Sequence, residues 1–346
     1  MLHIYQDFDF PIKVIGDRFS IVVDTETGKD LGISQPVHKY EGSHSTTIKI
    51  FISGNRITMK GNPSRINRLD NLFGFATIEQ CVRVFNKILL SLELPSFTKC
   101  TEIFHRQNKE TDKVQIFSNG ATITELHLTS NKSTGQGCAK DYIKGLSSLR
   151  YKYMIPRLHT NGNTADWLNK KGLGSSLIYP SVYNKADEIK LHTLDKIKRL
   201  HGEKSEEVKY ILNLIKYCEE QGVARFEQKL KSAFLRKHNF RFYGLFDEKL
   251  LRPIHEEFLN IDEKLQVTAM TLENISERLI RLNICNGTRS ANTTAMYALQ
   301  WMHGMSFDLS KSQVKTHRAR LRQVGIDIAD ICDLSRHSPV FVKKAK

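Results

Sequence analysis

The chain contains few cysteines, and their spacing excludes two ways of stabilising a fold. Six cysteines occur in 346 residues, and no two of them form a Cys-x-x-Cys pair. They are Cys81, Cys100, Cys138, Cys218, Cys285 and Cys332. A zinc ribbon needs paired cysteines, and a disulfide framework belongs to small secreted domains with regular cysteine spacing. We therefore expect free thiols in a reducing compartment.

Long hydrophobic runs and nucleotide-binding loops are also missing. No segment approaches the about 18 consecutive apolar residues of a membrane span, which excludes such a helix. The first residues, Met1–Asp7, lack the basic and apolar regions of a secretory signal. No Gly-x-x-x-x-Gly-Lys-Ser/Thr motif is present. We expect a cytoplasmic protein with no membrane partner and no nucleotide cofactor.

Acidic residues are scarce relative to basic ones. Lys and Arg number 52 against 37 Asp and Glu, which gives a net charge of +15. Such an excess favours nucleic acid as the partner, with an anionic membrane surface as the weaker alternative. Hydrophobic residues make up 40% and charged residues 26%, both within the globular range. A chain of this length is expected to form two domains.

The hydrophobic pattern predicts an α+β fold around an antiparallel sheet, followed by a smaller, mainly helical basic domain. Predicted strands are Phe19–Val23, Thr47–Ile52, Ile57–Met59, Lys113–Phe117, Ala121–Thr129, Ser175–Tyr179 and Gly222–Leu230. Predicted helices are a capped helix from Thr77 to before Pro95, Cys138–Leu149, Ala186–Gln221 with a break at Gly202, and a helical tail from about Arg241 to near Cys332. We place the domains at 1–242 and 243–346.

Tyr183 is the most informative single residue. It lies two residues before Lys185 and five before Glu188. If the segment is a strand, Tyr183 and Lys185 project from one face. The phenol could then attack a phosphodiester, Lys185 could favour the phenolate or hold a phosphate oxygen, and Glu188 could bind a divalent metal. A half-buried tyrosine beside a solvated lysine is the ordinary alternative, and Tyr179 is a second candidate nucleophile.

Two further motifs place charged side chains on one face of a predicted strand. In Glu125-Leu126-His127, the outer residues could hold one divalent ion, in the manner of nucleases of the histidine-hydrophobic-histidine type. In Arg225-Phe226-Glu227, Glu227 could complete that metal site and Arg225 could clamp a phosphate. An amphipathic strand and a cross-strand ion pair are the corresponding structural interpretations.

The tail contains a basic helix that favours contact with DNA. Its cations are Lys311, Lys315, Arg318, Arg320 and Arg322. A solvated basic helix is the alternative. The segment Val324–Ile328 is predicted to form the turn and start of a following element.

These blocks resemble, in order, the replication initiators of filamentous bacteriophages, the gene II protein family. Lys60–Ser64 through Asn71–Gly74 resembles its Lys-x-x-Pro and Asn-x-Phe-Gly segments, and Tyr183-x-Lys185-x-x-Glu188 matches the element that bears its nicking tyrosine. Val223–Glu227 resembles its Val-Arg-Phe-Glu strand, and the segment from Arg318 to Ile328 resembles its Arg-x-x-Leu-x-x-x-Gly-Ile-Asp ending. Glu125 and His127 stand where the family usually has Arg and Asp.

The resemblance implies a rolling-circle initiator. Such a protein binds double-stranded origin DNA, nicks one strand through Tyr183 to form a 5′-phosphotyrosine, and later rejoins the displaced single strand. It implies Mg²⁺ or Mn²⁺, held by some of Glu125, His127, Glu188 and Glu227, and a host helicase as partner. Two alternatives stay open. One is a binding-only replicon regulator, and the other is a tyrosine recombinase, which needs Arg and His around a tyrosine in a helical domain.

Overall fold

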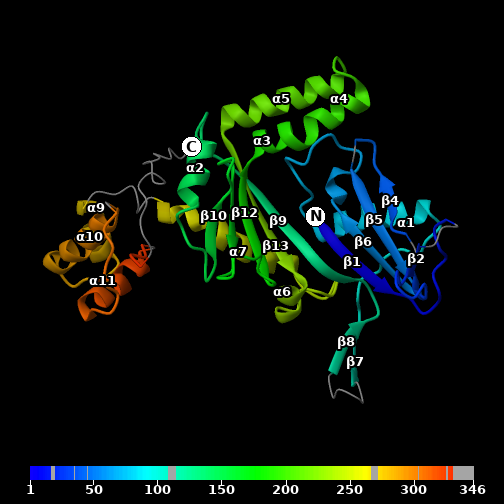
Figure 1. The fold of residues 1–346 in the computed structure, drawn as a ribbon, viewed down its shortest axis with the longest axis horizontal. Helices are drawn as coiled ribbons and strands as arrows, with labels where there is room; N and C mark the ends of the chain where they lie inside the picture. Colours follow the sequence, from blue (N-terminus) through cyan, green and yellow to red (C-terminus); the bar gives the residue numbers. More distant parts are fainter. Residues whose placement is uncertain are drawn as a thin grey trace.

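A nine-stranded antiparallel sheet forms the body of the molecule (Figure 1). The computed structural model describes residues 1–346 except 17–19, 35, 45, 108–113, 266–271, 303, 325 and 330–346. The predicted mixed fold with an antiparallel sheet is confirmed. From one edge to the other the strands are β10 (Ile155–Leu158), β11 (Thr164–Leu168), β12 (Ile178–Asn184), β13 (Val223–Lys231), β9 (Thr122–Ser133), β1 (Leu2–Asp7), β6 (Arg56–Gly61), β5 (Thr47–Ser53) and β4 (His38–Glu41).

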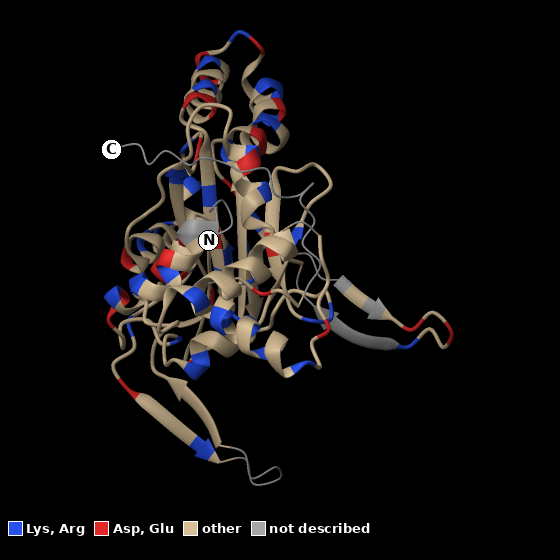
Figure 2. Cartoon of the chain, turned by 90° about the vertical axis from the view of Figure 1, so that its left-hand side faces the viewer, with Lys and Arg blue, Asp and Glu red and all other residues tan. Residues whose placement is uncertain are grey.

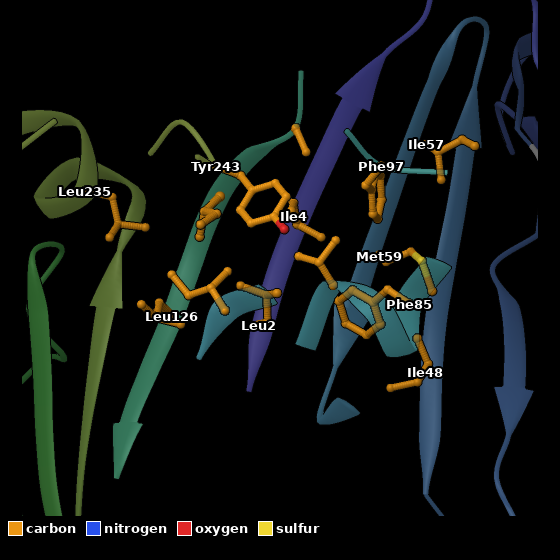
Figure 3. Close-up of a cluster of buried hydrophobic side chains, with 14 of the residues drawn as sticks. Leu2, Ile4, Ile48, Ile57, Met59, Phe85, Phe97, Leu126, Leu235 and Tyr243 are labelled. Carbon is orange, nitrogen blue, oxygen red and sulfur yellow. The ribbon is translucent and has the colours of Figure 1, made fainter. Parts of the chain in front are cut away.

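One face of the sheet is apolar and packs on helix α1 (Ile78–Ser91). The alternation of β1 and β6 directs Leu2, Ile4, Ile57 and Met59 to this face, where they meet Phe85 of the helix (Figure 3). Burial of a side chain as large as Phe85 contributes roughly 1.5–3 kcal/mol. The face opposite to this core is left for polar residues.

A capping box sets the start of α1. The Thr77 side chain accepts a hydrogen bond from the Gln80 backbone, and the Gln80 side chain accepts one from the Thr77 backbone. The box predicted from the sequence is therefore confirmed.

A second core lies behind β11, β12 and β13. There Trp167 and Phe226 pack edge-to-face on Phe258 of α7 (Leu251–Leu259), and α2 (Ala139–Leu146) adds Tyr142. Ile261, beyond α7, belongs to the same cluster. Residues that follow position 242 thus complete the core of the sheet.

The chain between β12 and β13 is helical. It comprises α3 (Lys185–Ile189), a π-helical turn (Lys190–Leu194), α4 (Asp195–His201) and α5 (Glu206–Gln221), with the predicted break at Gly202. Gly222 ends α5 in the left-handed conformation and leads directly into β13. The short link fixes where β13 begins, and so which of its residues face each side of the sheet.

Two hairpins project from the body (Figures 1 and 2). They are formed by β2 (Ser20–Val23) with β3 (Asp30–Ser34), and by β7 (Ile103–Gln107) with β8 (Val114–Ser118). Short helical elements are η1 (Pro63–Arg65), α6 (Ser232–Lys237), η3 (Glu248–Leu250) and η4 (Asn260–Lys264). Phe19, Lys113, Gly325 and Cys332, which fall in predicted elements, lie outside the described residues.

The tail is helical, as predicted. Its helices are α9 (Leu272–Arg281), α10 (Thr288–Met302) and α11 (Ser312–Gln323). They share a separate hydrophobic cluster that includes Leu279, Trp301 and Leu321. None of the helices within the described ranges combines the length and apolar character needed to cross a bilayer. The five cysteines in those ranges are free thiols.

Candidate active site

The polar face of the sheet gathers the charged motifs around the boundary of β12, β13 and β9. In the antiparallel register, Tyr183 lies opposite Arg225, Glu227 lies opposite Ser181 and Thr129, and His127 lies opposite Lys229. Directly opposed residues share a face. The register therefore places the phenol, two carboxylates and an imidazole on one side, away from the apolar core.

His127 lies between two carboxylates. Its Nε2 is 2.8 Å from Glu125 Oε1, and its Nδ1 is 2.8 Å from Glu227 Oε1. The imidazole side chain is only 5% exposed, which keeps water from replacing these hydrogen bonds. Although burial by itself raises the pKa of Glu227, the hydrogen bond and charge of His127 lower that pKa to about 2. The hydrogen bond from His127 also lowers the pKa of Glu125.

Tyr183 contacts the same cluster. Its hydroxyl donates a hydrogen bond to Glu227 Oε2 at 3.3 Å. Burial and the negative charge of Glu227 raise the pKa of Tyr183 well above its ordinary value. The tyrosine is therefore a neutral phenol in this arrangement, and an added positive charge would be needed to favour the phenolate.

Lys185 and Glu188 form a separate pair. The strand ends at Asn184, whose side chain caps α3, so Lys185 begins the helix and does not continue the strand face of Tyr183. Lys185 Nζ, on a side chain 1% exposed, donates to Glu188 Oε2 at 2.6 Å and to Asn71 Oδ1 at 2.8 Å. Burial lowers the pKa of Lys185, against the attraction of Glu188. The expectation that both residues lie on one strand face was wrong.

Arg225 is buried beneath the site. Its Nη1 donates to the Leu72 carbonyl at 3.1 Å and to Asn131 Oδ1 at 3.2 Å, while its Nε is buried without a hydrogen-bond partner. Arg225 lines a cavity of about 620 Å³ together with His127 and Glu227. The guanidinium therefore places positive charge at the wall of a cavity that also receives the charged cluster.

His3 is a site residue that the sequence analysis missed. It lies opposite Glu125 on β1, with its Nε2 3.8 Å from Glu125 Oε1. This nitrogen is buried and has no hydrogen-bond partner, and burial lowers the pKa of His3 to about 4. The alternation in Leu2-His3-Ile4-Tyr5 is a strand signal, but β1 and β9 are far apart in the sequence, so their pairing is not readable locally.

The candidate metal ligands divide into two groups. Glu125, His127 and Glu227 come together with His3, whereas Glu188 is paired with Lys185. Within the described ranges, no three His, Cys, Asp or Glu side chains have their donor atoms arranged to hold a metal ion. The reason at this cluster is that carboxylates occupy both nitrogens of His127. The donor types suit a divalent cation, but the present positions do not form a finished site.

The basic helix of the tail lies on α11. Lys311, Lys315 and Arg322 are exposed, whereas Arg318 forms a two-point ion pair with Asp327 and Arg320 donates to Ser290. The inward face of α11 consists of Val314, His317 and Leu321. The helix thus presents part of its predicted cationic set to solvent, and uses the rest within its own module.

Comparison with known proteins identifies the family. A family model for the N-terminal part of the replication-associated protein of phage gene II matches residues 19–249, and a model for its C-terminal part matches residues 279–346. The chain is 52% identical over 299 residues to the replication-associated gene II protein of Escherichia phage If1, which covers 86% of this chain and 92% of the relative. The chain belongs to the gene II protein family. No solved structure matches it significantly.

The N-terminal match to the gene II protein family contains most of the candidate site. Glu125, His127, Tyr183 and Glu227 all lie within residues 19–249, whereas His3 precedes that range. Helix α11 falls within the C-terminal match. The resemblance to the gene II family drawn from short blocks is therefore confirmed over most of the chain.

Proposed function

We propose that this member of the gene II protein family initiates rolling-circle replication of a phage replicon, by nicking one strand of a double-stranded origin and later religating the displaced strand. The observation that carries the proposal is the contact of the Tyr183 hydroxyl with Glu227, inside a cluster of carboxylate and imidazole groups on the open face of the sheet. A tyrosine there can serve as a nucleophile with an adjacent proton acceptor.

The chemistry assigned to Tyr183 is a transesterification. The phenol oxygen attacks the scissile phosphorus and becomes joined to the 5′ side, the bond to the 3′ oxygen breaks, and the phenol proton passes to Glu227. The 3′ oxygen leaves as a hydroxyl after taking a proton from solvent. Since one phosphodiester replaces another, the reverse attack by a 3′-hydroxyl can close the strand without ATP. Lys185 and Arg225 supply positive charge beneath the reacting phosphate.

A divalent cation, Mg²⁺ or Mn²⁺, is part of the proposal. Glu125, His127 and Glu227 would hold it, with the unpartnered Nε2 of His3 as an additional donor. His127 would release one of its two carboxylate hydrogen bonds to do so. When bound, the cation would favour the phenolate and stabilise charge on the phosphate oxygens. Glu188 remains the partner of Lys185 in this arrangement.

The proposed partners follow from charge and from the family. The net charge of +15 and the exposed Lys311, Lys315 and Arg322 suit contact with the origin duplex. A host helicase in the bacterial cytoplasm would separate the strands, because the sequence contains no Walker-type motif of its own.

The test is a nicking assay with origin DNA. Supercoiled plasmid carrying the phage origin is incubated with protein and Mg²⁺, and nicked circles are separated on a gel. Tyr183→Phe should reduce nicking by at least about a thousandfold, because the nucleophilic oxygen is gone, while origin binding in a gel-shift assay is retained. Tyr179→Phe is the matched control and should nick.

Two outcomes would contradict the proposal. Nicking by Tyr183→Phe at the wild-type rate would exclude Tyr183 as nucleophile. Origin binding by the wild type, with no nicking in either Mg²⁺ or Mn²⁺, would instead support the binding-only regulator.

A further inference from the structure

Three lysines form a row across one side of the open sheet face. Lys39 of β4 lies directly opposite Lys49 of β5, and Lys49 lies directly opposite Lys60 of β6. The core residues next to them in sequence, Ile48 and Met59, are fully buried on the other side of the sheet. The row, which we call the lysine ladder, therefore projects from the same face as the candidate site. Figure 1 shows its three strands side by side.

The ladder is electrostatically unfavourable for the folded protein alone. Like charges directly opposite each other in a sheet are destabilising. Within the described ranges, none of the three ammonium groups has a carboxylate at ion-pairing distance. Asp7, the acidic residue of the neighbouring strand β1, is already paired with Arg56 through two hydrogen bonds of 2.6 and 2.8 Å. An external anion is therefore the natural partner of the ladder.

The ladder leads to the candidate site. Lys60 lies opposite His3, and His3 in turn lies opposite Glu125, which contacts His127. Neighbouring strands are about 4.8 Å apart, so the ladder extends over roughly 10 Å and ends one strand away from His3. A polyanion laid along it would reach the charged cluster around Tyr183.

Aromatic rings accompany these cations. Lys60 Nζ lies 5.0 Å from the ring centroid of Phe51, and the Arg56 guanidinium lies 4.2 Å from that of Tyr5. Both rings are half-buried on the open face. Cationic side chains interleaved with aromatic rings are the combination by which proteins bind single-stranded nucleic acid, because phosphates pair with the cations and unpaired bases stack on the rings.

We propose that the ladder Lys39, Lys49 and Lys60 binds the backbone of a single DNA strand and leads it across the sheet to Tyr183. The inference rests on the proposed nicking function, which requires a single strand at the tyrosine. It adds a binding surface on β4, β5 and β6, at some distance from the reacting groups.

The test compares two charge-matched triple variants of the full chain. The ladder variant is Lys39→Gln, Lys49→Gln, Lys60→Gln. The control is Lys170→Gln, Lys171→Gln, Lys204→Gln, at three exposed positions in turns on other parts of the surface. Binding of a fluorescent oligothymidylate is measured by anisotropy over a range of salt concentrations. Thermal unfolding of each variant is recorded in parallel.

The ladder variant should bind the oligonucleotide at least about tenfold more weakly than the control. The slope of log affinity against log salt should shrink by about 2, because each lost phosphate contact on a single strand contributes about 0.7. Its melting temperature should equal or exceed that of the wild type, since like-charge repulsion is removed. This result would separate lost contacts from lost folding.

Equal affinity and slope for the two triple variants would overturn the inference. A loss confined to duplex DNA would overturn its assignment to a single strand. The outcome is independent of cleavage. If wild-type protein fails to nick, the proposed function fails even when ladder binding holds, and if it nicks while the ladder variant binds like the control, only the ladder inference fails.

Discussion

At the scale of single residues, the site is built around one imidazole held by two carboxylates. His127 satisfies both ring nitrogens through Glu125 and Glu227, and this keeps Glu227 ionised beside the hydroxyl of Tyr183. The arrangement orients the tyrosine but does not favour its phenolate, since burial and Glu227 both raise the pKa of Tyr183. A bound cation or phosphate-directed charge is what the geometry still requires for nucleophilic attack.

His3 predicts a pH dependence of stability. Its pKa in the folded protein is about 4, below the ordinary value of 6.5, because the ring is buried. As the pH falls from 6.5 towards 4, the unfolded chain takes up a proton that the folded chain excludes, so stability falls. His3→Asn should remove about 1–2 kcal/mol of this loss, allowing for a side chain that is still 18% exposed.

The measurement is urea unfolding at pH 7 and at pH 4.5. His192→Asn, at an exposed position, is the control and should follow the wild type. His255 contributes a similar loss in all three proteins, because burial lowers its pKa to about 4 as well. An unchanged pH dependence in His3→Asn would show that its ring titrates as it does in water.

At the scale of elements, the link from α5 to β13 decides which residues face the site. Gly222 has φ +59°, and a Cβ added there would lie 1.9 Å from the carbonyl oxygen of Gly135. Gly222→Ala should lower the free energy of unfolding by about 2–5 kcal/mol, through backbone strain and overpacking. Gly202→Ala, at φ +86° in open space, should cost only about 1–2 kcal/mol.

Chemical denaturation of both glycine variants tests this prediction. In Gly222→Ala, displacement of β13 should also shift the environment of Arg225 and Glu227, because both lie within five residues of the glycine. Equal stabilities for the two variants would mean that the chain rearranges around position 222 at little cost.

Local sequence signals predicted those elements that are specified locally. The capping box at Thr77, the turn between Ile52 and Ile57, and the break at Gly202 all depend on a few adjacent residues, and all are present. The helix start at Lys185 was not predicted, because the Asn184 cap and the pairing of Lys185 with Asn71 depend on a distant segment. Tertiary contacts override the strand alternation there.

The candidate site shows the same limit. Glu125 with His127 and Arg225 with Glu227 could be assigned to strand faces from alternation alone, and β9 and β13 do place them on one face. The inclusion of His3 depends on β1 pairing between β6 and β9. Such pairing between distant segments is set by the whole core, and short motifs do not encode it.

At the scale of the whole molecule, cores and charge are distributed unequally. Residues up to Ile261 contribute to the clusters of the sheet, and α9, α10 and α11 share another. The excess of basic residues is represented on both parts, by the lysine ladder and by α11. This distribution suits a protein that holds a single strand on the sheet and duplex DNA on the tail.

The central claim is that Tyr183 becomes covalently joined to the 5′ end of the nicked strand. Wild-type protein is reacted with origin DNA and Mg²⁺, and the adduct is digested with nuclease and trypsin and sequenced by mass spectrometry. The tryptic peptide from Gly172 to Lys185 contains both Tyr179 and Tyr183, so fragment ions distinguish the two. We predict a nucleotide on Tyr183. A nucleotide on Tyr179, or nicked DNA with no peptide attached, would contradict the account.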